Sequence, residues 1–279
     1  MGKVVIIGAG PGDPDLITIK AVKYLQSANV VLVDRLVSEE ILNQYVSSSA
    51  IIISVGKECS KKVSTPQQAI NDLIVHYAAN HALVIRLKGG DVAFFSNVLD
   101  ELQVLKENKI PFEIIPGITA ASAASAYTGI PLTARNYASA VRFLTLHNAN
   151  ELSNNQFKEL AATSDTLVWY MSSTNLNQLV ESLIAKGIDH SKWIAVIEQA
   201  STPLQRVFSA PILQFSEKFG HLSFLSPSLV IVGKVAELST AFSWFKSSNS
   251  KNALYFPALS QTYNLNFSPS FLFDYVSNT

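Results

Sequence analysis

The stretch from Val4 to Asp13 constrains the fold of this chain more than any other. It begins with an apolar run, Val4–Ile7, which predicts a short buried strand. The glycine-rich letters GAGPGD follow at residues 8–13, and a helical pattern comes next. A strand that ends in such a turn and continues into a helix exposes open backbone to a nucleotide-like ligand.

Asp13 separates this turn from a dinucleotide-binding turn, which reads G-x-G-x-x-G and has glycine where Asp13 stands. We expect Asp13 to cap the first helix, and its negative charge at that place would repel a phosphate. The loop therefore favours a nucleoside ligand without phosphates, and S-adenosylmethionine is the obvious candidate. A nicotinamide-dependent dehydrogenase is disfavoured for the same reason.

Short β-rich runs alternate with helical patterns along the first half of the chain. The expected strands are residues 3–8, 29–33, 50–55, 82–87 and 112–115. Their apolar residues mostly do not alternate, as expected when helices cover both faces of a parallel sheet. A helix is expected over residues 66–80, with Thr65 as its cap and Gln68 completing a capping box. This order predicts a right-handed, doubly wound α/β sheet.

The second half begins near residue 116 and repeats the mixture of strands and helices. Helices are expected at residues 118–127 and 174–186, and strands at 141–146, 166–171, 193–198, 205–208 and 229–232. The expected domains are residues 1–115 and 116–246. Residues 247–279 form a C-terminal tail without periodicity, whose aromatic residues favour packing over a solvated linker.

The composition favours a cytoplasmic protein that acts on small molecules. The 21 basic and 21 acidic residues balance, and no basic stripe indicates a nucleic-acid partner. Cys59 is the only cysteine, which excludes an intrachain disulfide and fits a reducing compartment. No apolar run reaches the ~18–20 residues of a membrane span, and the N-terminus enters a strand too early for a signal peptide. The histidines lack metal-ligand spacing, so we expect no metal site.

Each unusual loop of the first half follows an expected strand. Asp34 ends the second strand, Lys57 follows the third, the KGGD run at 88–91 follows the fourth, and PGIT at 116–119 follows the fifth. Ligands of open α/β sheets bind outside the carboxyl ends of the strands, so these loops are expected to share one site. Asp91 can accept hydrogen bonds from an amino group or from ribose hydroxyls. Helix capping by Asp34 and a solvated surface position for Lys57 remain alternatives.

Together these segments resemble the tetrapyrrole methylase family over about residues 3–240. The matching segments are GAGPGDPDLITIKA (8–21), VDRLVS (33–38), VGK (55–57), RLKGGD (86–91), PFEIIPGITAASAASAYTGIPLTAR (111–135), WYM (169–171) and QRV (205–207). The resemblance implies two α/β domains with the active site in the cleft between them, and a homodimer. Within the family, the chain is most similar to the members that use S-adenosylmethionine to methylate uroporphyrinogen III at carbon. Their product is precorrin-2, a precursor of sirohaem and cobalamin.

The resemblance also implies roles for single residues. Asp34 matches the family's proton acceptor, and Lys57 matches its proton donor. Contacts to the cofactor are implied for Pro11, Gly89, Gly90, Asp91, Phe94, Thr119, Ala120, Met171 and Ala200. Because the substrate carries eight carboxylates, Arg35, Arg135 and Arg142 are candidates for binding it.

Two alternatives to this function stay open, because the chain departs from the family pattern after Asp91. Asn97 stands where the family has an arginine, and Val98 and Leu99 replace two glycines. The substrate side has therefore lost basic residues, whereas the cofactor side is mostly intact. One alternative is a related methylase acting on another corrin precursor, and the other is a cofactor-binding protein with little catalysis.

Overall fold

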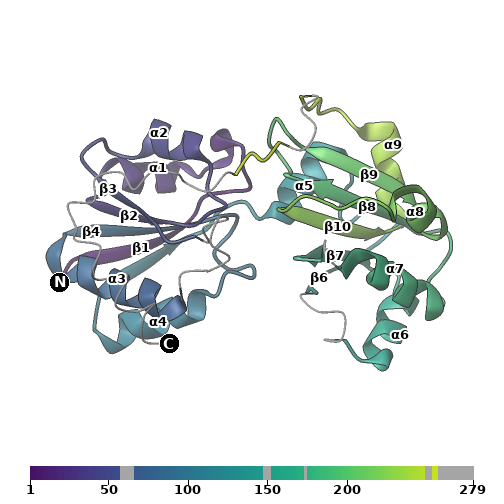
Figure 1. Ribbon diagram of the computed structural model, residues 1–279, viewed down its shortest axis with the longest axis horizontal. Coiled ribbons are helices and arrows are strands. Elements are labelled where there is room, and N and C mark those ends of the chain that lie inside the picture. Colours follow the sequence, from purple (N-terminus) through teal and green to yellow (C-terminus); the bar gives the residue numbers. More distant parts are fainter. Residues whose placement is uncertain (57–65, 147–151, 173–174, 249–252, 257–279) are drawn as a thin grey trace. The chain divides into compact units, whose positions relative to one another are not determined.

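The computed structural model describes residues 1–56, 66–146, 152–172, 175–248 and 253–256, and these residues form two units (Figure 1). The first unit contains the described parts of residues 1–9 and 17–117, together with Phe256. The second contains residues 10–16 and the described parts of 118–255. The expectations for Lys57 and Thr65, and those for residues 257–279, lie outside the described residues.

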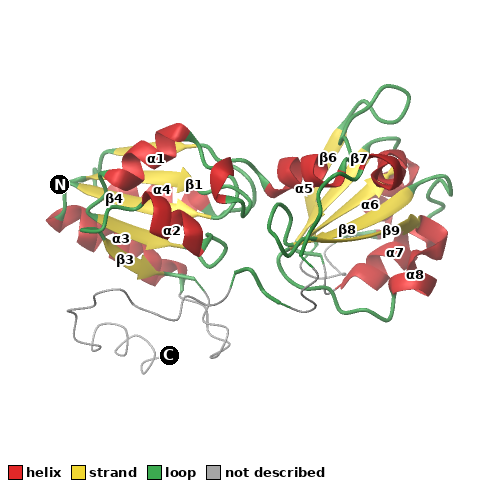
Figure 2. Cartoon of the chain, turned by 90° about the horizontal axis from the view of Figure 1, so that it is seen from above, coloured by secondary structure: helices red, strands yellow, loops and turns green. Residues whose placement is uncertain are grey.

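The first unit is the parallel, doubly wound sheet that the sequence predicts. Its strands run in the order β3-β2-β4-β1-β5, and every pair is parallel. They are β1 (Lys3–Gly8), β2 (Val30–Val33), β3 (Ile51–Ser54), β4 (Leu83–Lys88) and β5 (Phe112–Ile115). Helices α1 (Ile19–Gln26) and α2 (Glu39–Tyr45) cover one face, and α3 (Gln67–Asn80) and α4 (Val98–Glu107) cover the other (Figures 1 and 2).

Strand β1 explains why the sequence pattern does not alternate. Val4 and Ile6 pack in the cluster that contains residues of α3, whereas Val5 and Ile7 pack in the cluster that contains residues of α1 and α2. All four side chains are fully buried. A strand with helices on both sides buries every side chain, so each position contributes apolar area to one of two cores.

The second unit is built on a mixed sheet in the order β6-β7-β10-β8-β9. Its strands are β6 (Val141–Thr145), β7 (Thr166–Tyr170), β8 (Trp193–Glu198), β9 (Arg206–Pro211) and β10 (Ser228–Gly233). Only β6 and β7 pair in parallel, and the pairs among β7, β10, β8 and β9 are antiparallel. Helices α6 (Asn154–Ala162), α7 (Leu176–Ala185) and α8 (Ile212–Phe219) contribute to one core cluster, and α5 (Ala120–Thr128) contributes to the other. The short helix α9 (Ser239–Phe242) follows β10.

The predicted start of α3 is wrong in its detail. The helix begins at Gln67 after Pro66, which makes no side-chain capping bond. The Gln68 amide donates to Asp72 one turn further on, and the predicted capping box with Thr65 lies outside the described residues. None of the described helices is long and apolar enough to cross a membrane.

Candidate functional site

The order of the strands in the first unit places a topological switch point at their carboxyl ends. Strand β4 lies between β2 and β1. After β1 and β2 the chain continues into α1 and α2 on one face, whereas after β4 it continues into α4 on the opposite face. Neighbouring strand ends whose loops leave in opposite directions form the usual ligand site of an open α/β sheet.

Three glycines from different loops meet by their backbones at this edge. A Cβ atom on Gly8 would lie 2.7 Å from both the Gly117 nitrogen and the Gly90 oxygen, and one on Gly117 would lie 2.3 Å from the Gly90 oxygen. Real Cβ contacts are not that short, so only glycine allows the loops after β1, β4 and β5 to approach so closely. The predicted convergence of these three loops is confirmed.

Asp91 holds two of these loops together. Its Oδ1 accepts a hydrogen bond of 2.8 Å from the Ala93 backbone N–H, and its Oδ2 accepts one of 2.8 Å from the Gly117 backbone N–H. The side chain is 8% exposed. The carboxylate therefore braces the loop after β4 against the loop after β5, a role that the sequence pattern did not indicate. Phe94 lies three residues after Asp91 at a half-buried position.

Asp34 lies at the end of β2, and an arginine holds it there. Its Oδ1 accepts a hydrogen bond of 2.6 Å from Nη2 of Arg86, a residue of β4. The Asp34 side chain is 29% exposed, whereas Arg86 is 2% exposed. Among the described residues no group donates to its Oδ2. Helix α2 is capped by the Ser38 hydroxyl, so the alternative that Asp34 caps this helix is wrong.

The glycine-rich loop at residues 10–16 packs within the second unit. Oδ2 of Asp13 accepts a hydrogen bond of 2.6 Å from the Tyr127 hydroxyl, and the Asp13 N–H donates to Oγ of Ser201. Burial and the bond to Asp13 raise the pKa of Tyr127 to about 12. The prediction that Asp13 caps the first helix is wrong, because a 3₁₀ turn intervenes and Thr18 caps α1.

Strained backbone marks two other loops of the second unit. Met171 follows β7 with φ of +55° and is 43% exposed. Gln199 and Ser201 flank Ala200 with φ of +48° and +64°. Non-glycine residues in this region cost ~1–3 kcal/mol each and cluster at functional sites.

The start of α5 is tied to the end of β7 in the same unit. The hydroxyls of Thr119 and Tyr170 are 2.7 Å apart, and the Ala121 N–H donates to the Tyr170 oxygen at 3.2 Å. Ala120 is the first residue of α5, so Thr119 and Ala120 lie beside the residue that precedes Met171.

Sequence reasoning missed a segment at residues 253–255, which forms hydrogen bonds with the loop at residues 10–16 and with the loop that contains Gln199. The Gln199 amide donates to the Ala253 carbonyl at 3.0 Å and accepts from the Tyr255 N–H at 2.7 Å. The Tyr255 hydroxyl donates to the Gly12 carbonyl at 3.4 Å. The only sequence signal for this contact was the aromatic content of the tail.

The three candidate arginines have different surroundings. Arg142 on β6 pairs with Glu159 and Asp165 at 2.6 Å each, so two carboxylates already balance its charge. These carboxylates raise the pKa of its guanidinium. Arg35 is half-buried directly after Asp34.

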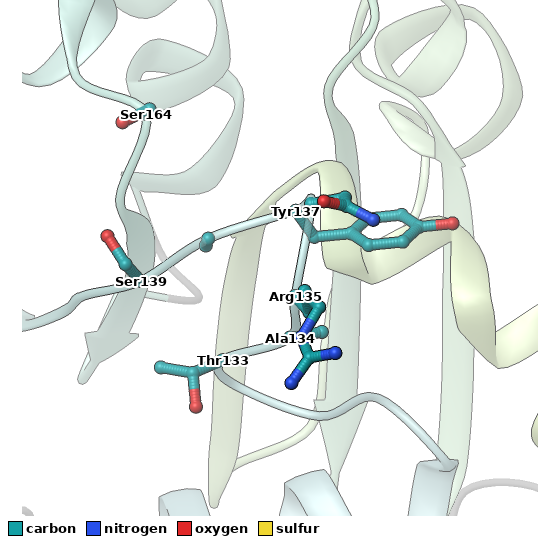
Figure 3. A pocket seen from close by; sticks show the side chains of 8 residues that line it. Thr133, Ala134, Arg135, Tyr137, Ser139 and Ser164 are labelled. Atoms are coloured by element: carbon teal, nitrogen blue, oxygen red, sulfur yellow. The ribbon is translucent and has the colours of Figure 1, made fainter.

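Arg135 lines an open cavity of about 650 Å³ with Thr133, Tyr137 and Ser164 (Figure 3). Ser164 precedes β7, whereas Met171 follows it. The five-residue strand β7 separates these two ends by roughly 17 Å at the usual rise per residue. The cavity that Arg135 lines thus includes a residue at the end of β7 opposite to Met171.

Comparisons with known proteins place these loops in a family context. The family model of the tetrapyrrole (corrin/porphyrin) methylases matches residues 3–215. Siroheme synthase 2 of Aeromonas hydrophila is 43% identical over 245 residues, which are 88% of this chain and 51% of that protein. The chain thus spans about half the length of that relative.

Two further relatives match almost from end to end. Uroporphyrinogen-III C-methyltransferase of Bacillus subtilis is 43% identical over 255 residues, which cover 91% of this chain and 98% of that protein. The crystal structure of a uroporphyrin-III C-methyltransferase from Thermus thermophilus with S-adenosylhomocysteine has a TM-score of 0.70 and 32% identity. The match covers 85% of this chain and all of that one.

Proposed function

Because the chain belongs to the tetrapyrrole (corrin/porphyrin) methylases, we propose that it methylates uroporphyrinogen III at carbon to give precorrin-2. S-Adenosylmethionine is the methyl donor. The observation that carries the proposal is the meeting of Gly8, Gly90 and Gly117 beside Asp34 at the carboxyl edge of the first sheet. The full-length similarity to the Bacillus subtilis and Thermus thermophilus enzymes supports the choice of substrate.

The residues at this edge fit a nucleoside ligand. A Cβ at Gly8 or Gly117 would collide with backbone, so these loops pack main chain against main chain and no Cβ covers them there. When bound, S-adenosylmethionine supplies an activated methyl group for in-line transfer to a nucleophilic carbon. The residues proposed to bind it are Pro11, Gly89, Gly90, Asp91, Phe94, Thr119, Ala120, Met171 and Ala200.

Asp34 is proposed as the proton acceptor. Its Oδ1 is held by Arg86, and its partial exposure leaves the carboxylate accessible. A carboxylate so placed can take the proton that leaves the methylated pyrrole, or stabilise positive charge that develops on the ring. Lys57 is proposed as the proton donor, and Arg35, Arg135 and Arg142 as substrate-binding residues. Of these arginines, Arg142 has the weakest case, because Glu159 and Asp165 already neutralise it.

A cytoplasmic homodimer without nucleic-acid partners completes the proposal. The zero net charge argues against nucleic-acid binding, and the single cysteine fits a reducing compartment.

An anaerobic assay with uroporphyrinogen III and S-adenosylmethionine tests the function. The expected product carries two additional methyl groups, detected by its mass. Asp34→Asn should lower turnover by about 10²- to 10⁴-fold, the usual contribution of a positioned acid or base. Glu40→Gln, which changes an exposed acid on α2, is the matched control and should leave turnover unchanged.

Calorimetry separates the alternatives. Binding of S-adenosylhomocysteine without turnover of uroporphyrinogen III would favour another corrin precursor or a binding protein with little catalysis. The altered loop at Asn97 is the feature that favours these alternatives. Tighter binding of NAD than of S-adenosylhomocysteine would overturn the methylase proposal.

A further inference from the structure

A buried ionic cluster lies directly beneath Asp34 in the first unit. Arg86 and Lys88 project from β4, and Glu101 projects from α4 (elements labelled in Figure 1). Oε1 of Glu101 accepts a hydrogen bond of 2.8 Å from Nε of Arg86 and one of 2.9 Å from Nζ of Lys88. Glu101 is fully buried, and the two cations are 2% and 4% exposed. Burying charged groups this deeply is costly unless they are paired, so the presence of this cluster requires a structural or functional explanation.

The charges of this cluster balance only when Asp34 is included. Arg86, Lys88 and Glu101 alone leave one positive charge inside the protein, and the ionised Asp34 carboxylate neutralises it at 2.6 Å from Arg86. Burial disfavours the charged guanidinium, but the nearby carboxylates of Asp34 and Glu101 outweigh this effect and raise the pKa of Arg86. Lys88 shows the opposite balance, since burial and the charge of Arg86 lower its pKa.

All three guanidinium nitrogens of Arg86 donate hydrogen bonds. Nε bonds to Glu101, Nη2 bonds to Asp34, and Nη1 donates to the Leu32 and Leu87 carbonyls at 3.4 and 3.2 Å. The Leu32 carbonyl belongs to β2, the strand that delivers Asp34. A planar guanidinium fixed at four points can orient a carboxylate in a way that the single ammonium group of a lysine cannot.

We propose that Arg86 is a positioning residue, which fixes Oδ1 of Asp34 so that Oδ2, to which none of the described residues donates, is presented for proton transfer. Glu101 holds the guanidinium from the other side, and Lys88 balances Glu101 without touching Asp34. This inference rests on the proposed function, because it assigns Arg86 a part in the turnover that Asp34 performs. It also explains why two cations occupy the buried face of β4 immediately before the glycines of the cofactor loop.

A double-mutant cycle on turnover tests the inference. Arg86→Met, Asp34→Asn and the double variant are compared with the unmodified protein for kcat and for S-adenosylhomocysteine affinity. Arg86→Met should lower kcat by about tenfold or more while affinity stays within about threefold, since the interaction acts on the reacting carboxylate. In a protein that already carries Asp34→Asn, Arg86→Met should lower kcat only a little further. The two substitutions are then coupled in kcat by a factor of about ten or more.

Lys88→Met is the matched comparison, because it removes the other cation bound to the same Glu101 oxygen. Lys88→Met should destabilise the first unit about as much as Arg86→Met does. Its fold-reduction in kcat should nevertheless multiply with that of Asp34→Asn to give the value of the double variant within about threefold. Arg86→Lys keeps the buried charge, and it can replace Arg86→Met in the double-mutant cycle if Arg86→Met does not fold. It should restore stability in part, but not kcat, because the fork is lost.

The outcomes separate the two levels of the argument. An active unmodified protein with effects of Arg86 and Asp34 that multiply independently would overturn the positioning role alone. Full activity of Asp34→Asn would overturn it as well, since there would be no acceptor to position. No methylated product from the unmodified protein would overturn the proposed function, and this inference with it.

Discussion

Replacing Asp91 tests whether the glycine loops are braced by a carboxylate. If Asp91 only contacted the cofactor, its removal would weaken binding and leave the unliganded protein unchanged. In the structure its two oxygens accept hydrogen bonds from the Ala93 and Gly117 amides, so Asp91→Ala should release both amides without any ligand present. The ligand-free protein is therefore the informative sample.

The expected size follows from the two bonds. Hydrogen bonds to a charged group contribute about 1.5–3 kcal/mol each, and each 1.36 kcal/mol corresponds to about a factor of ten. Native-state hydrogen exchange at the Ala93 and Gly117 amides should therefore become about 10- to 100-fold faster in Asp91→Ala. Asp91→Asn keeps one oxygen but turns an NH₂ group toward the other amide, so one of the two sites should stay protected and the other should not.

Exchange measured by nuclear magnetic resonance on ligand-free protein gives both amides separately. Asp72→Asn is the control, since within the described part of the chain the Asp72 side chain bonds only to Gln68, at an exposed position, and the change should leave both amides unchanged. Tryptophan fluorescence reports the second unit, where all three tryptophans lie, and should be unaffected. Unaltered exchange at Ala93 and Gly117 in Asp91→Ala would refute the brace.

Two further predictions concern the glycine contact and the loop at Asp13. Gly117→Ala sets a Cβ 2.3 Å from the Gly90 oxygen and should cost at least about 2 kcal/mol in urea denaturation. Gly187→Ala meets open space and should cost only the ~1–2 kcal/mol of its left-handed φ; equal losses would contradict the contact argument. Folding raises the pKa of Tyr127 from 10.0 to about 12, so its neutral hydroxyl contributes fully below pH 10, and this contribution is lost as the pH rises toward 12. In Tyr127→Phe, an absorbance titration at about 295 nm should lose a tyrosine that ionises near pH 12, and an unchanged alkaline limb would disprove the pairing with Asp13.

The sequence by itself determined where the strands of this protein lie, and which loops of the first unit meet at one edge of its sheet. Continuous apolar runs predict buried strands because the pattern is local, and β1 and β5 have the predicted bounds. The glycines at residues 8, 90 and 117 could be recognised because each follows such a run. Their meeting then follows from a general rule, since the carboxyl ends of parallel strands share one edge.

The tertiary structure alone decided which charged side chains face one another. Arg86 reaches Asp34 across 52 positions of sequence because β4 inserts between β2 and β1, an order that no local pattern encodes. The same long-range packing neutralises Arg142 and assigns the loop at residues 10–16 to the second unit. Periodicity reports what each segment buries, whereas the partner of a charge depends on which segments become neighbours, and that is fixed only when the whole chain packs.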